Sequence, residues 1–191
     1  YGKFRAVEYD AADSLSLEDL AQFDREIVVH AAIADALGYK LSIHSGSDKF
    51  SVFAAIGRAT GERFHAKTSG TSWLEAMRLV AQKEPALFRA CYAYAQEVFT
   101  ECRAYYHVST ELSMVPAIEA MPDDALPTLL DRVPSRQLLH ITYGKILNHP
   151  ALRAPLFRLW RDCRDAYETL EKNHLARHLA LLCPEHAIAP Q

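Results

Sequence analysis

The hydrophobic positions of the chain recur every three or four residues over several long stretches, which is the spacing of an amphipathic helix. The first stretch follows Ser16, a capping residue, and stops at Gly38, which suits the left-handed end of a helix. A second stretch covers about 85–104 and begins with a proline, as the first turn of a helix allows. A third covers about 152–182 and contains one break. These patterns predict three long helices.

Three shorter helices are expected between the long ones. One begins near Phe50. A second begins at Ser72, which has the spacing of a capping box with Glu75, and runs through Ala81. The third lies near 124–130.

Short runs of apolar or β-branched residues alternate with these helices, and each run predicts a strand. The four predicted strands cover 40–44, 63–67, 105–109 and 137–143. The alternation indicates an α/β fold with a parallel sheet, built from one helix followed by about four βα units. A (β/α)8 barrel averages about 31 residues per unit, so we expect a single α/β domain over 1–191 that forms half of such a TIM-type barrel. An open doubly wound sheet also fits the alternation, but it usually shows a glycine-rich phosphate turn, and GxGxxG is missing.

Each predicted strand places a histidine two residues from a polar partner. Residues two apart share one face of a strand, so the four histidines are expected on one face, near the edge where the active sites of these barrels lie. A histidine in a strand is often only a core or rim residue, but four with matched parity favour a shared metal or catalytic site. Imidazole suits Zn, Mn, Ni or Co. The pairs are Ser42 and His44, His65 and Lys67, His107 and Ser109, and His140 and Thr142.

Two loops rich in serine, threonine and glycine follow the first two predicted strands, at 45–49 and 68–72. Backbone N–H groups at the start of a helix bind anions, and Lys49 and Lys67 could add positive charge for a carboxylate or phosphate. Plain helix capping explains each loop equally well. A further pair, His174 and His178, has helical i, i+4 spacing without the glutamate of a zinc-protease helix, and we expect it on an exposed basic face.

The composition narrows the classes of partner. Half of the 191 residues are hydrophobic, and the net charge is −3 with no basic block, so a nucleic-acid partner is not expected. No apolar run approaches the roughly 20 residues of a membrane span, and no leader segment opens the sequence, so we expect a cytoplasmic protein with no membrane partner. The four cysteines are spaced neither for a CxxC metal site nor for a disulfide framework.

Two runs of sequence carry a longer pattern, KLSIHSGSDKFS at 40–51 and FHAKTSGTSWLEA at 64–76. With 106–109, 139–144 and 177–179, they resemble the tagaturonate epimerase family, and the resemblance extends over nearly the whole chain from Leu20 onward. It implies a metal-dependent isomerase that interconverts D-tagaturonate and D-fructuronate by inverting C4. Family members are longer, so the resemblance also implies that this chain is the C-terminal half of a barrel.

The resemblance implies roles for particular residues. His107 and His140 would bind the divalent cation (Mn, Ni, Co or Zn), and His65 would donate a proton. The proton acceptor and a third metal ligand would come from an N-terminal half, so the expected partners are a small sugar acid and either that upstream half or a second copy of the chain. The residues expected to contact the substrate are His44, Asp48, Lys49, Lys67 and Thr68.

Alternatives remain open at the level of the sequence. A retro-aldol route, which cleaves and re-forms the C3–C4 bond, would give the same products. Another metal-dependent barrel enzyme acting on sugars, such as an aldolase or an isomerase, would use similar residues. A non-catalytic fragment whose relatives are enzymes is the third possibility.

Overall fold

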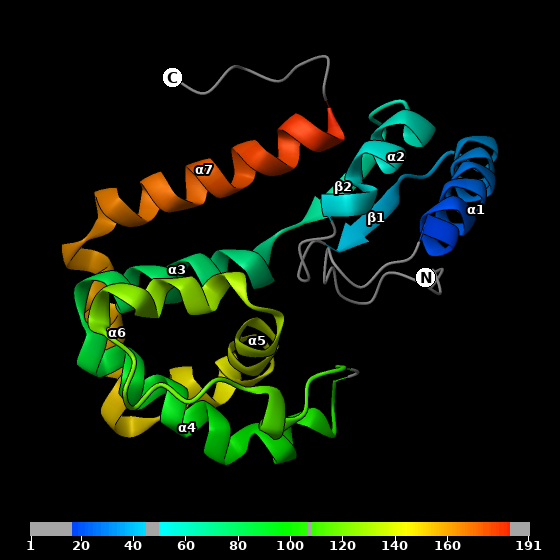
Figure 1. Cartoon of the computed structure of the whole chain (residues 1–191). Helices are drawn as coiled ribbons and strands as arrows, with labels where there is room; N and C mark the ends of the chain where they lie inside the picture. The colour runs from blue at the N-terminus through cyan, green and yellow to red at the C-terminus, as the bar shows by residue number, and fades with distance from the viewer. Residues whose placement is uncertain (1–16, 45–49, 107, 184–191) are drawn as a thin grey trace. The chain divides into compact units, whose positions relative to one another are not determined.

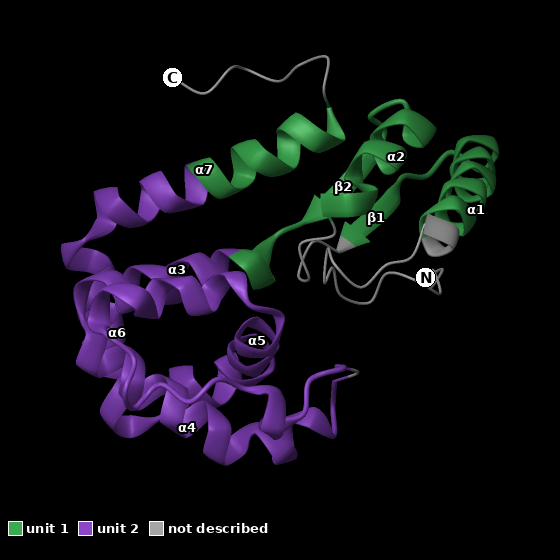
Figure 2. Cartoon of the chain, in the orientation of Figure 1, with its two compact units in different colours: residues 1–71, 173–191 green, residues 72–172 purple. Residues whose placement is uncertain are grey.

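The computed structural model describes residues 17–44, 50–106 and 108–183 (Figure 1). The chain divides into two compact units (Figure 2). Unit 1 consists of 1–71 and 173–191, and unit 2 consists of 72–172. The expectation of one domain over 1–191 stays a prediction. In the part of the chain that is described, no helix is long and apolar enough to cross a membrane.

Unit 1 contains the parallel pair of strands. Its first helix, α1 (Leu17–Ala36), buries a stripe of residues at helical spacing that includes Phe23 and Ile27. The helix ends in a Schellman motif: Gly38 has φ +71°, its N–H donates to Asp35, and the Tyr39 N–H donates to Ala34 at 3.0 Å. The predicted stop at Gly38 is confirmed. The other elements of unit 1 are β1 (Leu41–His44), α2 (Phe50–Thr60), β2 (Phe64–Lys67), the start of α3 (Ser69–Lys83) and the end of α7 (Arg164–Leu182).

The two strands pair in parallel, with Leu41 beside Phe64 and Ile43 beside Ala66. These four side chains form the covered face of the sheet and pack into the core of unit 1. That core also takes residues from three helices, and the buried ones are Phe23, Ile27, Val52, Phe53, Ala55, Ile56 and Leu182. The alternation of apolar and polar residues in both strands therefore places one set of side chains inside, as predicted.

Helix α2 and the end of α7 approach each other closely within unit 1. A Cβ atom added at Gly57 would collide with the carbonyl oxygen of Leu182, so only glycine fits this position. Leu182 itself is 1% exposed. The end of the described chain therefore packs directly against the backbone of α2.

Unit 2 is built from helices in the part of the chain that is described. Pro85 occupies the first turn of α4, as predicted, and the break in the third long stretch falls at Cys163, between α6 and α7. The predicted short helix near 124–130 is a 3₁₀ helix. The elements beyond α3 are α4 (Pro85–Arg103), η1 (Leu112–Met114), η2 (Asp123–Asp131), α5 (Val133–Asn148), α6 (Pro150–Asp162) and the start of α7.

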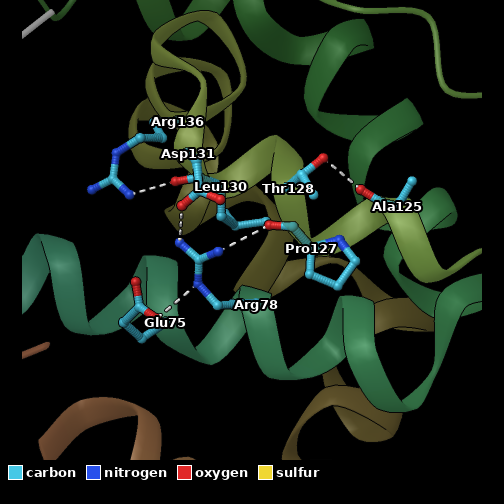
Figure 3. Close-up of polar contacts among 8 residues, drawn as sticks. All are labelled: Glu75, Arg78, Ala125, Pro127, Thr128, Leu130, Asp131 and Arg136. Atoms are coloured by element: carbon cyan, nitrogen blue, oxygen red, sulfur yellow. Dashed lines mark hydrogen bonds and ion pairs between the residues drawn. The ribbon is translucent and has the colours of Figure 1, made fainter. Parts of the chain in front are cut away.

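A polar network joins α3 to η2 inside unit 2 (Figure 3). The Arg78 guanidinium donates to Glu75 Oε2 at 2.9 Å, to Asp131 Oδ1 at 2.9 Å and to the Pro127 carbonyl at 3.0 Å. Burial alone lowers the pKa of Arg78, but the hydrogen bonds and charges of Asp131 and Glu75 outweigh it and raise the pKa above its ordinary value. Glu75 is only 5% exposed, so this cation balances a buried carboxylate.

Two of the four predicted strands are wrong. Segment 137–143 lies inside helix α5, which packs against α4, η2 and α6. Leu138, Leu139 and Ile141 are all buried there, and a short apolar run cannot be distinguished from a buried helix by periodicity alone. Pro134, in the first turn of α5, was the signal for a helix.

The other wrong strand is the predicted 105–109. Tyr105 and Tyr106 form turns after α4, and Val108 and Ser109 have no regular structure. The α/β class stands on unit 1, but four βα units do not form in the described residues, and the half-barrel remains a prediction.

The predicted capping box is also wrong. Helix α3 begins at Ser69, so Ser72 lies inside the helix, where its hydroxyl donates to Glu171 Oε1 at 2.5 Å.

Candidate functional site

The second face of the two-stranded sheet carries the polar side chains. Ser42, His65 and Lys67 are all exposed, and they alternate with the core residues of β1 and β2. The register places Ser42 directly beside His65 and residue 44 beside Lys67. Ser42 Oγ lies 3.3 Å from His65 Nδ1, so a hydroxyl contacts one edge of the imidazole. Ser42, His65 and Lys67 therefore share one face, as predicted, while the side chain of His44 lies outside the part of the chain that is described.

The other residues predicted to contact the substrate are close in sequence to β1 and β2. His44 is the last residue of β1, while Asp48 and Lys49 lie outside the described residues. The Thr68 carbonyl accepts from the Thr71 N–H at 2.9 Å and from the Thr71 hydroxyl at 2.8 Å, which closes the first turn of α3. In the second predicted loop, residues 69–72 are therefore helical.

Of the two predicted metal ligands, only His140 lies among the described residues. His140 lies in α5 within unit 2, not at the end of a strand, so its predicted shared parity with His65 is wrong. His107 lies outside the described residues. Among residues 17–44, 50–106 and 108–183, no group of three or more histidine, cysteine, aspartate or glutamate side chains is arranged to hold a metal ion.

One buried residue of α5 has a role that the sequence analysis missed. Gln137 is fully buried, its Oε1 accepts from the Thr110 N–H at 2.9 Å, and its Nε2 donates to Ser109 Oγ at 3.1 Å. These two residues follow His107 by two and three positions, and Gln137 lies one helical turn before His140. A polar residue among buried leucines was the available signal, since a buried amide requires partners.

The histidine pair of α7 is not on a solvated face. His178 is 2% exposed, and its ring centroid lies 5.0 Å from that of Phe50 and 5.2 Å from that of Phe53. Its Nδ1 lies 2.9 Å from the His174 carbonyl oxygen. The expectation of an exposed basic face is therefore wrong for His178, which belongs to the packing of unit 1.

Unit 2 has an open cavity of about 510 Å³ near the end of α5. Burial raises the pKa of the Tyr106 hydroxyl, and the nearby Tyr143 and Cys102 raise it further. The Lys145 ammonium lies 2.5 Å from Glu101 Oε1. The residues that line the cavity are Tyr94, Tyr106, Ile141, Tyr143, Gly144, Lys145, Asn148, His149 and Pro150.

Comparisons with known proteins agree in sequence and in fold. The sequence profile of a family described as tagaturonate epimerase matches residues 13–182. A tagaturonate/fructuronate epimerase from Thermotoga maritima is 48% identical over 166 residues, which cover 86% of this chain and 34% of that protein.

Solved structures give the same result. The native crystal structure of a fructuronate-tagaturonate epimerase from Cohnella laeviribosi matches with a TM-score of 0.81 and 50% identity, over 85% of this chain and 34% of that one. A complex of that protein with two glycerol molecules matches with a TM-score of 0.82 and 49% identity, over 85% of this chain and 35% of the other. The chain thus spans about a third of the length of these relatives.

Proposed function

Because this chain belongs to the tagaturonate epimerase family, we propose that it forms part of an isomerase that interconverts D-tagaturonate and D-fructuronate by inverting C4. The observation that carries the proposal is the match of about half the residues, over most of this chain, to proteins named for that activity. The relatives found do not favour another sugar aldolase or isomerase. Because this chain spans only about a third of their length, the remaining polypeptide would supply the rest of the site.

His65 is the residue proposed to move a proton. An imidazole is the commonest general acid or base near neutral pH, and Ser42 holds one edge of this ring. Lys67 lies two residues further along the same strand and on the same exposed face. Its ammonium could therefore hold the carboxylate of a uronate beside the imidazole. His44, Asp48, Lys49 and Thr68 remain proposed contacts to the same substrate.

His107 and His140 are proposed to supply two imidazole ligands to a divalent cation. The support from the described residues is indirect: Gln137, one turn before His140, bonds Ser109 and Thr110, which closely follow His107 in the sequence. A cation bound there would act as a Lewis acid toward a sugar oxygen. Mn, Ni, Co and Zn all suit imidazole, and further ligands would have to come from outside this pair.

The exposed face of the sheet also supports the proposal that further polypeptide covers it. Parallel sheets almost always have both faces covered, whereas Ser42, His65 and Lys67 are exposed in this chain. We expect further polypeptide of the same protein, or a second copy, to lie over this face. Light scattering of this chain at several concentrations tests the second copy, since a stable monomer of 21.5 kDa with cooperative unfolding and no concentration dependence would contradict self-association and the half-barrel.

The activity itself is tested by incubating D-fructuronate with the chain, and with the full product of its gene, and following tagaturonate by NMR. His65→Gln should lower the rate by roughly 10²–10⁴-fold, which is the usual contribution of a general acid or base. His30→Gln, a partly buried histidine of α1, is the matched control and should retain the rate. Absence of interconversion by the full gene product, loaded with each of the four metals, would overturn the proposal.

A further inference from the structure

We infer that the open cavity of unit 2 is a binding site for the hydroxyl groups of a small polyhydroxylated ligand. The inference deepens the proposed function, because it names a part of unit 2 that would hold the sugar chain of the substrate. The cavity lies where the turn after α4, the C-terminal half of α5 and the start of α6 meet. Its volume of about 510 Å³ is within the usual range of small-molecule sites.

The lining has the chemistry of a site for hydroxyl groups. Tyr94, Tyr106 and Tyr143 give it three aromatic rings, each with a hydroxyl that can both donate and accept. Tyr106 is 40% exposed and Tyr143 is 46% exposed, so both are reachable from solvent. Asn148 adds a carboxamide. Such a combination of flat apolar surface and a few polar groups suits the two sides of a sugar.

The hydrogen bonds of His149 define which ring nitrogen carries the proton. The Ala151 N–H donates to His149 Nδ1 at 3.2 Å, so Nδ1 bears the lone pair and the neutral ring carries its hydrogen on Nε2. The ring packs edge to face on Tyr94, with centroids 4.4 Å apart. These two contacts hold the ring of His149, a residue of the cavity lining, in place.

The charges of the lining favour hydroxyl groups over a carboxylate as the main anchor. Lys145 is the cation of the cavity lining, and its ammonium is already paired with Glu101 at 2.5 Å. An anionic ligand would have to compete with this contact. The cavity therefore suits the neutral hydroxyl-bearing part of a sugar acid better than its acid group.

The cavity adjoins the histidine proposed to bind the cation. Ile141 follows His140 directly, and Tyr143 and Gly144 lie three and four residues after it, on the same side of α5. A ligand in this cavity would lie next to the helical turn that carries His140. This adjacency is why we assign the cavity to the substrate rather than to an unrelated molecule.

Gly144 offers a direct test, because a Cβ atom added there would meet no atom within 4 Å. Gly144→Leu therefore adds an apolar side chain to the cavity lining without removing a polar side chain, and its Cβ meets no other atom. Ala154→Leu, on an exposed position of α6, is the matched control. Binding is measured by calorimetry on the full chain with D-fructuronate, with D-fructose (hydroxyls without a carboxylate) and with succinate (carboxylates without hydroxyls).

We expect Gly144→Leu to weaken both sugars at least tenfold, Gly144→Ala to weaken them less, and Ala154→Leu to leave them unchanged. Succinate should bind none of the proteins measurably. Equal affinity of the parent and both Gly144 variants, absence of sugar binding by the parent, or succinate binding as tight as that of fructose would each overturn the inference. The smaller Gly144→Ala keeps the test valid if the leucine variant does not fold, which thermal unfolding reveals.

The same proteins separate this inference from the proposed function. If Gly144→Leu loses sugar binding and the gene product does not epimerise fructuronate, the inferred binding site is supported and the proposed function is contradicted. Epimerisation with unchanged kcat and KM in Gly144→Leu contradicts the cavity and leaves the function intact.

Discussion

The two units of the chain reach stability by different means. Unit 2 is a continuous segment, 72–172, and contains most of the largest fully buried side chains, such as Phe88, Tyr92 and Leu129. Unit 1 joins the start of the chain to its end, and among the described residues it contains Phe53, Ile27 and Ile56 of that set. Unit 1 also leaves one polar face of its sheet exposed. Within the described residues, the strands that carry the proposed proton donor thus lie in the unit with fewer of the largest buried side chains, as expected for regions that bind ligands.

The largest expected effects come from removing one buried ring in each unit. Phe53 and Phe88 are both 0% exposed, and truncating a buried phenylalanine to alanine typically costs about 3–5 kcal/mol. We expect Phe53→Ala to lower hydrogen-exchange protection mainly in unit 1, and Phe88→Ala mainly in unit 2. Exchange measured by mass spectrometry on peptides of each unit shows the difference. Equal loss of protection in both units from either variant would mean that they unfold as one.

The second largest expected effect on stability comes from the close approach of α2 and α7. Gly57→Ala forces a Cβ atom against the Leu182 carbonyl, and overpacking of this kind costs about 1–3 kcal/mol. Gly144→Ala is the control in unit 2, where the added Cβ meets nothing and the gain in helix propensity is about 0.5–1 kcal/mol. Denaturant unfolding of the two variants should therefore shift in opposite directions. A neutral Gly57→Ala would show that the end of α7 contributes little to unit 1.

The buried thiol of Cys91 should make the stability of unit 2 depend on pH. Burial raises the pKa of its thiol from 9.0 to about 12. The unfolded chain loses this proton first, so its contribution to stability is constant below about pH 9 and is lost as the pH rises toward 12. Between pH 8 and pH 10 the free energy of unfolding should fall by about 1 kcal/mol more in the parent than in Cys91→Ala. Parallel pH profiles of the two proteins would contradict this.

The smallest effect concerns a surface ion pair of unit 2. The hydrogen bond from Arg103, at 2.6 Å, lowers the pKa of Glu111 below its ordinary value. A lowered carboxyl pKa stabilises the fold above that ordinary value, and the gain is lost as the pH falls through the folded pKa. Arg103→Gln should return the Glu111 pKa toward 4.5 in an NMR titration and leave the melting temperature almost unchanged. A large drop in melting temperature would show that this ion pair stabilises the fold more than a solvent-exposed pair usually does.

The sequence was most informative where local signals decide the structure. Gly38 and Pro85 mark the end of α1 and the start of α4 because backbone geometry requires such residues there. Alternation in β1 and β2 predicted the exposed face with His65 because one side of each strand packs on a core. Segment 137–143 was misassigned because α5 is buried on several sides, which removes the polar stripe that identifies a helix.

The site was less predictable than the strands. The bonds of Gln137 to Ser109 and Thr110 join residues 28 and 27 positions apart, and no local pattern reports such a contact. The cavity at the end of α5 likewise forms from three segments that are separate in the sequence. Family resemblance named histidines without revealing that His140 is helical and lies in a different unit from His65.

The packing of Leu182 against Gly57 also sets an order of events during synthesis of the protein. A ribosome releases 72–172 as one uninterrupted stretch, so unit 2 can fold while translation continues. The segment that contains β1 and β2 emerges earlier, and the helix that packs on Gly57 leaves the exit tunnel only after 72–172. The nascent sheet must therefore wait through more than a hundred residues with part of its core exposed to water, a period in which chaperones or upstream polypeptide would have to cover it.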